Sequence, residues 1–269
     1  MGRRTLSKAA RFAKGVTAGV EQFGGVDDPA PLLAAVKSGA VSVAAIDAAV
    51  ARILKPKCEM GLFENPYVDA EAAVAIVGAP ESQREADVAQ REAQVLLENR
   101  GCLLPLAPTK RKLWLYRIDP HVAIRAGFVV VTDPSRANVA IVRMDPPAER
   151  LHPHHFFGSR QNEGRLHFED GDPDYEALKR ASAQVPTVVA VNLDCPAILT
   201  RVKDKARALI VTFGASDAAI VDAAMGNAKP KGRLPFDLPR TGASLERQDP
   251  AILDDSIYPL YRSGFGIQL

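Results

Sequence analysis

The sequence predicts an α/β fold, namely a three-layer α/β sandwich with a mainly parallel sheet, preceded by N-terminal helices. Short apolar, β-branched runs alternate with polar helical stretches after Pro105, which is typical of the strand and helix units that build a parallel sheet. The runs are hydrophobic almost without interruption, as expected for strands that are buried on both faces. Before Pro105 the apolar residues recur at helical spacing instead. With 269 residues, 47% of them hydrophobic, the chain can bury a large core.

Helices are predicted throughout the part that precedes Pro105. Asp28 and Ser42 are expected to cap two of them, because short polar side chains accept hydrogen bonds from the first free N–H groups of a helix. Gly61 is expected to end a helix in the left-handed conformation. Residues 62–69 are interpreted as a linker. The helices predicted here lie at residues 6–23, 32–37, 43–60, 70–77 and 82–98.

The part that follows Pro105 is predicted to hold the sheet. Strands are expected at residues 113–117, 128–132, 139–143, 187–193 and 208–213, and helices at 173–184, 196–203 and 216–225. Residues 145–172 break this alternation, and we expect a long irregular loop or a hairpin there; long loops in compact domains are often functional. Residues 227–269 are rich in proline and glycine, and we expect an extended arm packed over the sheet.

Charge and cysteine content exclude several classes of function. The net charge is +2, from 34 basic and 32 acidic residues, which argues against nucleic acid or an anionic membrane as a partner. Cys58, Cys102 and Cys195 are far apart and show no CxxC spacing, so we expect no disulfide framework and a cytoplasmic protein. No apolar run reaches a membrane span, and no secretory signal is expected. We expect no cofactor, because the sequence has no glycine-rich phosphate loop with its flanking strand and helix.

Several segments, in this order along the chain, resemble family 3 glycoside hydrolases, the β-glucosidase group. The closing part carries the most specific motifs, Phe213-Gly-Ala-Ser-Asp217 and Lys231-Gly-Arg-Leu-Pro-Phe-Asp-Leu-Pro239, followed by Tyr258-Pro-Leu-Tyr261 and Gly264-Phe-Gly266. The earlier matching segments are residues 11–25, 46–54, 61–69, 92–99 and 104–106. Each motif is weak alone, but their common register makes the resemblance specific.

The resemblance implies a two-part chain. Residues 1–69 look like the helical end of the family's N-terminal (β/α)8 barrel with its linker, and residues 70–269 look like its C-terminal α/β sandwich domain. In the family the nucleophile is an Asp of the barrel, and no stretch of this chain matches that motif. A whole barrel takes roughly 250 residues. The chain is therefore expected to be a truncated enzyme that is inactive alone.

The resemblance also suggests where the acid/base group lies. A glycosidase needs two carboxyl groups beside the scissile bond, and one of them protonates the leaving oxygen. The family's acid/base loop matches the segment after the strand at 139–143, which makes Glu149 the first candidate and Glu163 the second. A surface ion pair of Glu149 with Arg150 is the alternative.

Histidines and aromatic residues follow Glu149 in the same loop. They could line a sugar subsite, hold a metal or be plain loop residues; no nearby carboxylate or cysteine completes a zinc set, so we expect no metal. The candidate substrate-binding residues are His154, His155, Phe156 and Phe157. Ser216 is expected to cap a helix, since its surroundings lack a G-x-S-x-G elbow, and a cap is also the favoured role of Asp133.

Three functional hypotheses remain open at this stage. The chain could be an enzyme component that acts on a β-glucoside or a related saccharide, with the barrel supplied in trans. It could be a non-catalytic carbohydrate-binding or protein-interaction module. It could also be the structural remnant of a split gene. The apolar helix positions Phe12, Val16 and Val20 would be exposed without a barrel, so we also expect self-association through the N-terminal helices.

Overall fold

The computed structural model describes residues 6–107, 111–149, 151–154, 163–249, 252 and 255–269. The chain divides into two compact units, Met1–Val77 and Gly78–Leu269. This division falls one helix later than the boundary expected between residues 69 and 70. The two units are described separately below.

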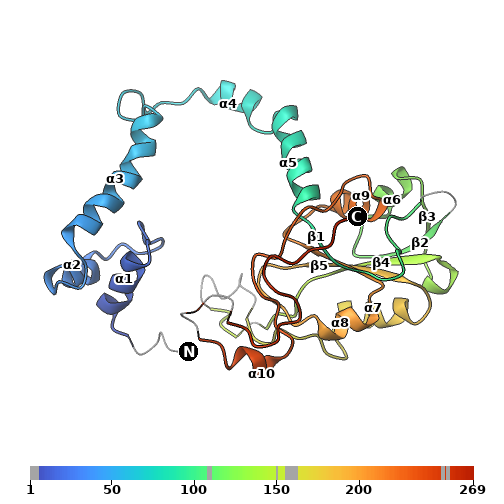
Figure 1. The fold of residues 1–269 in the computed structure, drawn as a ribbon. Coiled ribbons are helices and arrows are strands. Elements are labelled where there is room, and N and C mark those ends of the chain that lie inside the picture. Colours follow the sequence, from blue (N-terminus) through green and yellow to red (C-terminus); the bar gives the residue numbers. More distant parts are fainter. Residues whose placement is uncertain (1–5, 108–110, 150, 155–162, 250–251, 253–254) are drawn as a thin grey trace. The chain divides into compact units, whose positions relative to one another are not determined.

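The first unit contains only helices within its described residues (Figure 1). They are α1 (Lys8–Thr17), α2 (Ala30–Lys37), α3 (Val43–Glu59) and α4 (Ala70–Ile76). Ser42 caps α3 by accepting from Ala45 N at 3.2 Å, and Gly61 adopts a φ of 66° after its end, so both predictions are confirmed. Asp28 lies one residue before the cap position of α2, which Pro29 occupies, although its carboxylate accepts from Ala30 N.

Few side chains of the first unit are buried. Phe12 and Phe23 stack with their ring centroids 4.3 Å apart, because the chain turns back after α1 ends at Thr17, where the sequence had predicted helix up to residue 23. The buried apolar residues among those described are Pro31, Ala35, Val41 and Ala49. Apolar side chains that stay exposed include Val20, Leu33, Val43, Val50, Leu54, Met60 and Phe63.

The second unit is built on a six-stranded sheet with the order β1-β6-β5-β4-β2-β3 (Figure 1). Its strands are β1 (Val95–Asn99), β2 (Lys112–Tyr116), β3 (Val129–Val131), β4 (Val139–Met144), β5 (Thr187–Asn192) and β6 (Ala208–Thr212). Only β1 runs antiparallel to its neighbour β6; the other pairs are parallel. The predicted mainly parallel α/β fold is confirmed.

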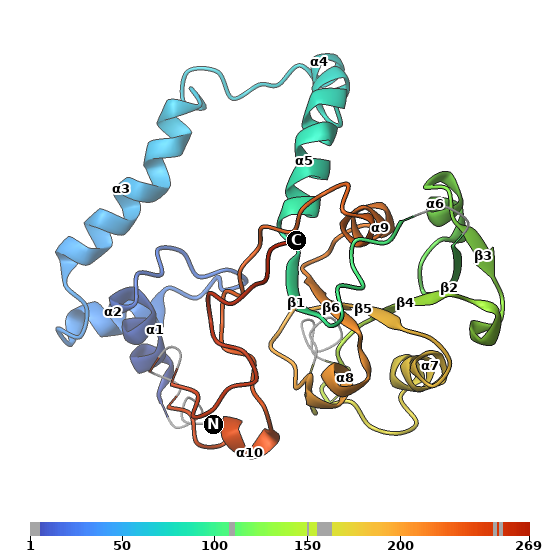
Figure 2. The ribbon, with the colours of Figure 1, turned by 45° about the vertical axis from the view of Figure 1, so that its right-hand side comes forward.

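Helices cover both faces of this sheet, as Figures 1 and 2 show. The helices of the unit are α5 (Pro80–Glu92), α6 (Pro120–Arg125), α7 (Pro173–Ser182), α8 (Thr200–Lys205), α9 (Asp217–Met225) and the short α10 (Gly242–Leu245), with a 3-10 turn at Pro134–Arg136. Buried residues of α7 and α8 pack in one core cluster, and those of α6 and α9 pack in the other. This arrangement gives the three predicted layers.

Alternate side chains of each central strand enter different cores. In β5, Val189 and Val191 belong to the cluster under α7 and α8, whereas Val188 and Ala190 belong to the cluster under α9. Both sets are fully buried. Burial on both faces explains why the strands read as continuous apolar runs in the sequence.

The predicted helix at residues 82–98 is wrong in its last part. Helix α5 ends at Glu92, and Val95–Asn99 forms β1, in which Leu96 pairs with Ile210. The buried apolar run and its pairing with a distant strand override the helical pattern that precedes it. Helix α8 likewise begins at Thr200 rather than at residue 196, and the sequence pattern did not indicate α6.

The C-terminal arm packs on the sheet as predicted. Leu234, Leu238 and Leu260 are buried in the core cluster under α7 and α8. Tyr261 donates its hydroxyl hydrogen bond to Glu98 of β1 at 2.5 Å, and burial together with this bond raises the pKa of Tyr261 far above its usual range. Among the described residues, no helix is long and apolar enough to span a membrane.

Candidate functional site

The long loop at residues 145–172 begins where β4 ends at Met144 and stops where α7 begins at Pro173. Its ends therefore lie at the carboxyl edge of the parallel strands, where ligands of open α/β sheets bind. Residues 145–149, 151–154 and 163–172 of this loop are described. Both candidate carboxylates belong to these segments.

Glu149 and Glu163 are brought side by side. They form an isolated antiparallel bridge, in which Glu149 N donates to Glu163 O at 2.8 Å. Gly164 follows with a φ of 86°, and a Cβ atom there would lie 2.1 Å from Glu149 Oε2. The close approach of the Glu149 carboxylate to the backbone thus requires glycine at this position.

The two carboxylates have different partners. Glu163 accepts from both the backbone N and the Nδ1 atom of His152 at 3.1 Å, and 22% of its side chain is exposed. Within the described part of the chain, the carboxylate of Glu149 has a single, longer ionic contact, 3.7 Å between Oε1 and Arg165 Nε, and 43% of its side chain is exposed. Glu149 is therefore the carboxylate that a substrate could reach.

The predicted sugar-lining residues are only partly within the described structure. His154 is described and exposed. His155, Phe156 and Phe157 lie outside the described residues, and so does Arg150, the alternative partner of Glu149. No group of three or more His, Cys, Asp or Glu side chains that could hold a metal is found within the described part of the chain.

Arginines that the sequence analysis did not single out anchor the loop. Arg165 forms two hydrogen bonds with the carboxylate of Asp172, one of them 2.8 Å long. Arg117, just after β2, donates to Asp145 and, at 2.7 Å, to Asp174. A hollow of about 250 Å³ lies between these pairs and is also lined by residues 146–148. Neither arginine belongs to a recognisable motif, so its role follows only from the fold.

Other polar residues near this edge have structural partners. Ser216 caps α9 by accepting from Ala219 N at 3.3 Å, and Asp133 caps the 3-10 turn by accepting from Ser135 N at 2.9 Å, which confirms both sequence interpretations. Asp217 pairs with Arg143 at 2.6 Å. These side chains are therefore engaged in the fold.

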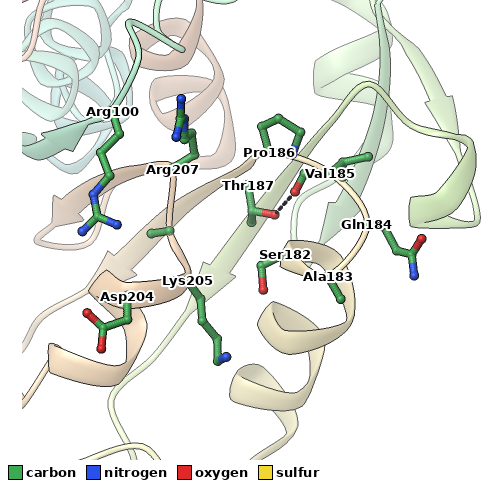
Figure 3. A pocket seen from close by; sticks show the side chains of 11 residues that line it. Arg100, Ser182, Ala183, Gln184, Val185, Pro186, Thr187, Asp204, Lys205 and Arg207 are labelled. Atoms are coloured by element: carbon green, nitrogen blue, oxygen red, sulfur yellow. Dashed lines mark hydrogen bonds between the residues drawn. The ribbon is translucent and has the colours of Figure 1, made fainter.

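A larger hollow of about 430 Å³ lies near the starts of β5 and β6, at the amino edge of the sheet (Figure 3). Its lining includes Arg100, Lys205 and Arg207, and Figure 3 shows that these side chains point in different directions. Asp204 supplies the only carboxylate of the lining. Glycoside hydrolysis needs two carboxyl groups, so this hollow does not fit that chemistry.

Asp170, on the returning part of the loop, links it to two helices. Its carboxylate accepts from Lys179 of α7 at 2.7 Å and from Arg201 of α8 at 2.9 Å. The hydrogen bonds from Lys179 and Arg201 lower the pKa of Asp170 from 3.8 to about 2. Ionisation of Asp170 therefore stabilises the folded state relative to the unfolded state.

We expect this pair of contacts to contribute to stability above about pH 4 and to lose its effect as the pH falls to about 2. The Asp170→Asn variant should consequently unfold at a lower urea concentration than the wild type at neutral pH. The difference should vanish toward pH 2. Urea denaturation followed by the fluorescence of Trp114, the single tryptophan, measures this; a difference that is constant with pH would contradict it.

Comparison with known proteins agrees with this architecture. The family model of the glycosyl hydrolase family 3 C-terminal domain matches residues 128–269. A periplasmic β-glucosidase/β-xylosidase from Dickeya chrysanthemi is 46% identical over 266 residues, which cover 99% of this chain and 40% of that protein. β-Glucosidase C from Emericella nidulans is 32% identical over 274 residues, covering 99% and 43%. The chain thus spans about two fifths of the length of these relatives.

Solved structures share the fold. A β-glucosidase from Erythrobacter marinus matches with a TM-score of 0.66 at 20% identity, over 97% of this chain and 45% of that protein. A β-glucosidase from Listeria innocua in complex with glucose matches with a TM-score of 0.62 at 20% identity, over 97% and 44%. The residues that the family model matches, 128–269, include strands β3 to β6, the loop and the closing motifs, and the chain belongs to the glycosyl hydrolase family 3 C-terminal domain family.

Proposed function

We propose that this chain supplies the general acid/base group, Glu149, to the active site of a β-glucosidase-like enzyme. The nucleophile would come from a barrel outside these 269 residues. The observation that carries the proposal is the position of Glu149. Glu149 lies beside Glu163 in a bridged segment at the carboxyl edge of the sheet. Among the described residues, its carboxylate has no close hydrogen bond of the kind that His152 makes with Glu163.

The chemistry of glycoside hydrolysis supports a second component. In a retaining enzyme a second carboxylate attacks the anomeric carbon on the opposite side from the acid. Glu163 is a poor nucleophile, because both its carboxylate oxygens face His152 at 3.1 Å. The partner would therefore be a barrel that carries this carboxylate, with a β-glucoside or related saccharide bound between them and His154 near the sugar.

The first unit supports a partner surface. Its exposed apolar side chains include Val20, Val50 and Leu54, and such groups are stabilised when another surface removes them from water. The barrel would cover them in an assembled enzyme. In its absence the chain would associate with itself through the same helices, which light scattering at several concentrations would detect.

An exchange of homologous segments tests the proposed function. The segment of the Dickeya chrysanthemi relative that matches this chain is replaced by residues 1–269, and the product is called the exchanged enzyme. We expect it to hydrolyse an aryl β-glucoside, whereas the 269-residue chain alone should show no turnover. The unmodified relative is the positive control.

Two outcomes would contradict the proposal. A folded exchanged enzyme that binds glucose without hydrolysing the glucoside would favour a non-catalytic carbohydrate-binding module. Turnover by the isolated chain that disappears in its Glu149→Gln variant would place the nucleophile within the chain itself.

We also propose that the chain is located in the cytoplasm. The three cysteines are all free thiols, which supports a reducing cytoplasm, whereas the Dickeya chrysanthemi relative is named periplasmic. Fractionation of the native host with an antibody against this chain would decide between the two locations.

A further inference from the structure

Two arginines fix the opposite ends of the loop that carries Glu149. Both ends are attached to the start of α7, where Asp172 is the cap residue and Asp174 lies in the first turn. Arg117 holds the outgoing end and Arg165 the returning end. The two attachments are built differently.

The outgoing end is held by a four-residue cluster. Arg117 donates to Asp174 at 2.7 Å and to Asp145, the first residue after β4. Asp174 also accepts from Asp145 N at 2.9 Å and from the Tyr116 hydroxyl at 3.1 Å. The side chain of Asp174 is only 14% exposed, so solvent screens these charge-assisted bonds less than it screens surface pairs.

The backbone of Arg117 is in a conformation that costs energy. Its φ is 54°, in the left-handed region that residues other than glycine rarely adopt. Strain of this kind persists only where surrounding contacts hold it, and it gathers at functional sites. Here the guanidinium of the same residue is hydrogen-bonded to both Asp145 and Asp174.

The returning end is held by Arg165. Its guanidinium forms two hydrogen bonds with Asp172, whose carboxylate also accepts from Glu169 N at 2.7 Å. The hydrogen bonds from Arg165 hold the pKa of Asp172 below its usual range. The neighbouring Phe168 is buried in the core, so this part of the loop is firmly attached to the unit.

Arg165 connects this firm part to the candidate acid. Its Nε atom lies 3.7 Å from Glu149 Oε1, while its other nitrogens bind Asp172. A planar guanidinium can contact two carboxylates in fixed directions, which a lysine ammonium cannot do as well. The Glu149 carboxylate thus lies beside a guanidinium that the cap residue of α7 holds in place.

We propose that Arg117 and Arg165 are positioning residues for Glu149: they hold the two ends of its loop on α7 so that the carboxylate projects from a fixed backbone. This inference rests on the proposed acid/base role of Glu149. It predicts that losing either arginine loosens the bridge between Glu149 and Glu163 and weakens proton donation, while the sheet unit stays folded.

The first test uses the 269-residue chain as it is. Amide hydrogen exchange of the Glu149 N–H, which donates to Glu163 O, is measured by NMR in the wild type and in the Arg165→Met, Arg165→Lys and Arg117→Met variants. We expect exchange at least about tenfold faster in all three, because this hydrogen bond opens locally when the loop ends are released. The Arg91→Met variant is the matched control, since it removes an ion pair with Asp222 of α9 without touching the loop.

The second test separates positioning from general stability. In the exchanged enzyme, hydrolysis of a phenyl glucoside needs a proton from the acid, whereas a dinitrophenyl glucoside has a leaving group that needs none. We expect Arg165→Met to lower kcat/KM for the phenyl glucoside at least about tenfold more than kcat/KM for the dinitrophenyl glucoside, because kcat/KM reports the step in which the leaving group departs. Arg165→Lys should recover only part of this loss, and Arg91→Met should lower both rates equally or not at all.

The outcomes distinguish this inference from the proposed function. If Glu149→Gln shows the leaving-group effect and the arginine variants do not, the positioning role is wrong and the acid/base role stands. If Glu149→Gln shows no such effect, the proposed function itself fails. Unchanged exchange of the Glu149 N–H in Arg165→Met, with Trp114 fluorescence reporting a folded unit, would also overturn the positioning role.

Discussion

Replacing Glu149 with glutamine should lower kcat/KM of the exchanged enzyme for a phenyl glucoside by on the order of 10²–10⁴-fold. Glutamine keeps the shape of the side chain and the bridge with Glu163, since that bridge uses backbone atoms. It cannot donate a proton to the leaving oxygen. For a dinitrophenyl glucoside the loss of kcat/KM should be much smaller, because kcat/KM reports the first step, in which this leaving group departs without protonation. Initial rates with both substrates, for wild type and variant, measure the difference.

Glu163→Gln is the matched control for this prediction. The substitution removes a carboxylate from the same bridged pair. In the wild type this carboxylate of Glu163 is paired with His152. We expect a loss of less than about tenfold, similar for both substrates, as for a residue outside proton transfer. If Glu163→Gln instead showed the strong dependence on the leaving group, the assignment of the two carboxylates would have to be reversed.

The sheet could be predicted from the sequence because its strands are buried on both faces. Apart from Arg143 and Thr212, the runs at residues 139–143 and 208–213 are apolar, and β4 and β6 occupy them almost to the residue. The sequence analysis missed β1, although Val95, Leu96 and Leu97 are also buried. Val95–Asn99 follows α5 directly, and its strand character comes from pairing with β6, which is distant in the sequence.

The candidate site could be predicted only in part. The position of Glu149 followed from the resemblance, because its loop has a fixed place after β4. The ion pairs that hold the loop could not be predicted. Arg117 pairs with Asp174 and Arg165 pairs with Asp172, and no motif distinguishes these charged residues from ordinary surface charges. Ion pairs of this kind are decided by side-chain geometry, which residue spacing does not encode.

Gly232, in the closing motif, does not owe its place to a left-handed backbone. Its φ is not among the positive values found for the described glycines. A Cβ atom at Gly232 would instead lie 2.4 Å from Ala93 O and 2.7 Å from Gln94 O. The arm passes so close to the backbone just before β1 that no side chain fits.

Gly232→Ala should therefore destabilise the sheet unit by about 3 kcal/mol or more, at or beyond the upper range for overpacked sites, because backbone atoms cannot move aside as a flexible side chain would. The arm has two further anchors that would be strained at the same time: Gly232 N donates to Gln94 O at 3.1 Å, and Ile267 N donates to Leu96 O at 2.8 Å. Urea denaturation followed by Trp114 fluorescence should show a midpoint lowered by about 1 M or more.

Gly242→Ala is the matched control, because it makes the same chemical change in the same unit. No atom lies within 4 Å of a Cβ built at Gly242, and this residue begins helix α10. Alanine there should leave the midpoint unchanged or raise it slightly, since it restricts the unfolded chain without strain in the folded one. A Gly232→Ala midpoint within error of the Gly242→Ala value would show that the arm can move away from β1 without cost. Close packing against the backbone would then not explain why the closing motif has glycine at position 232.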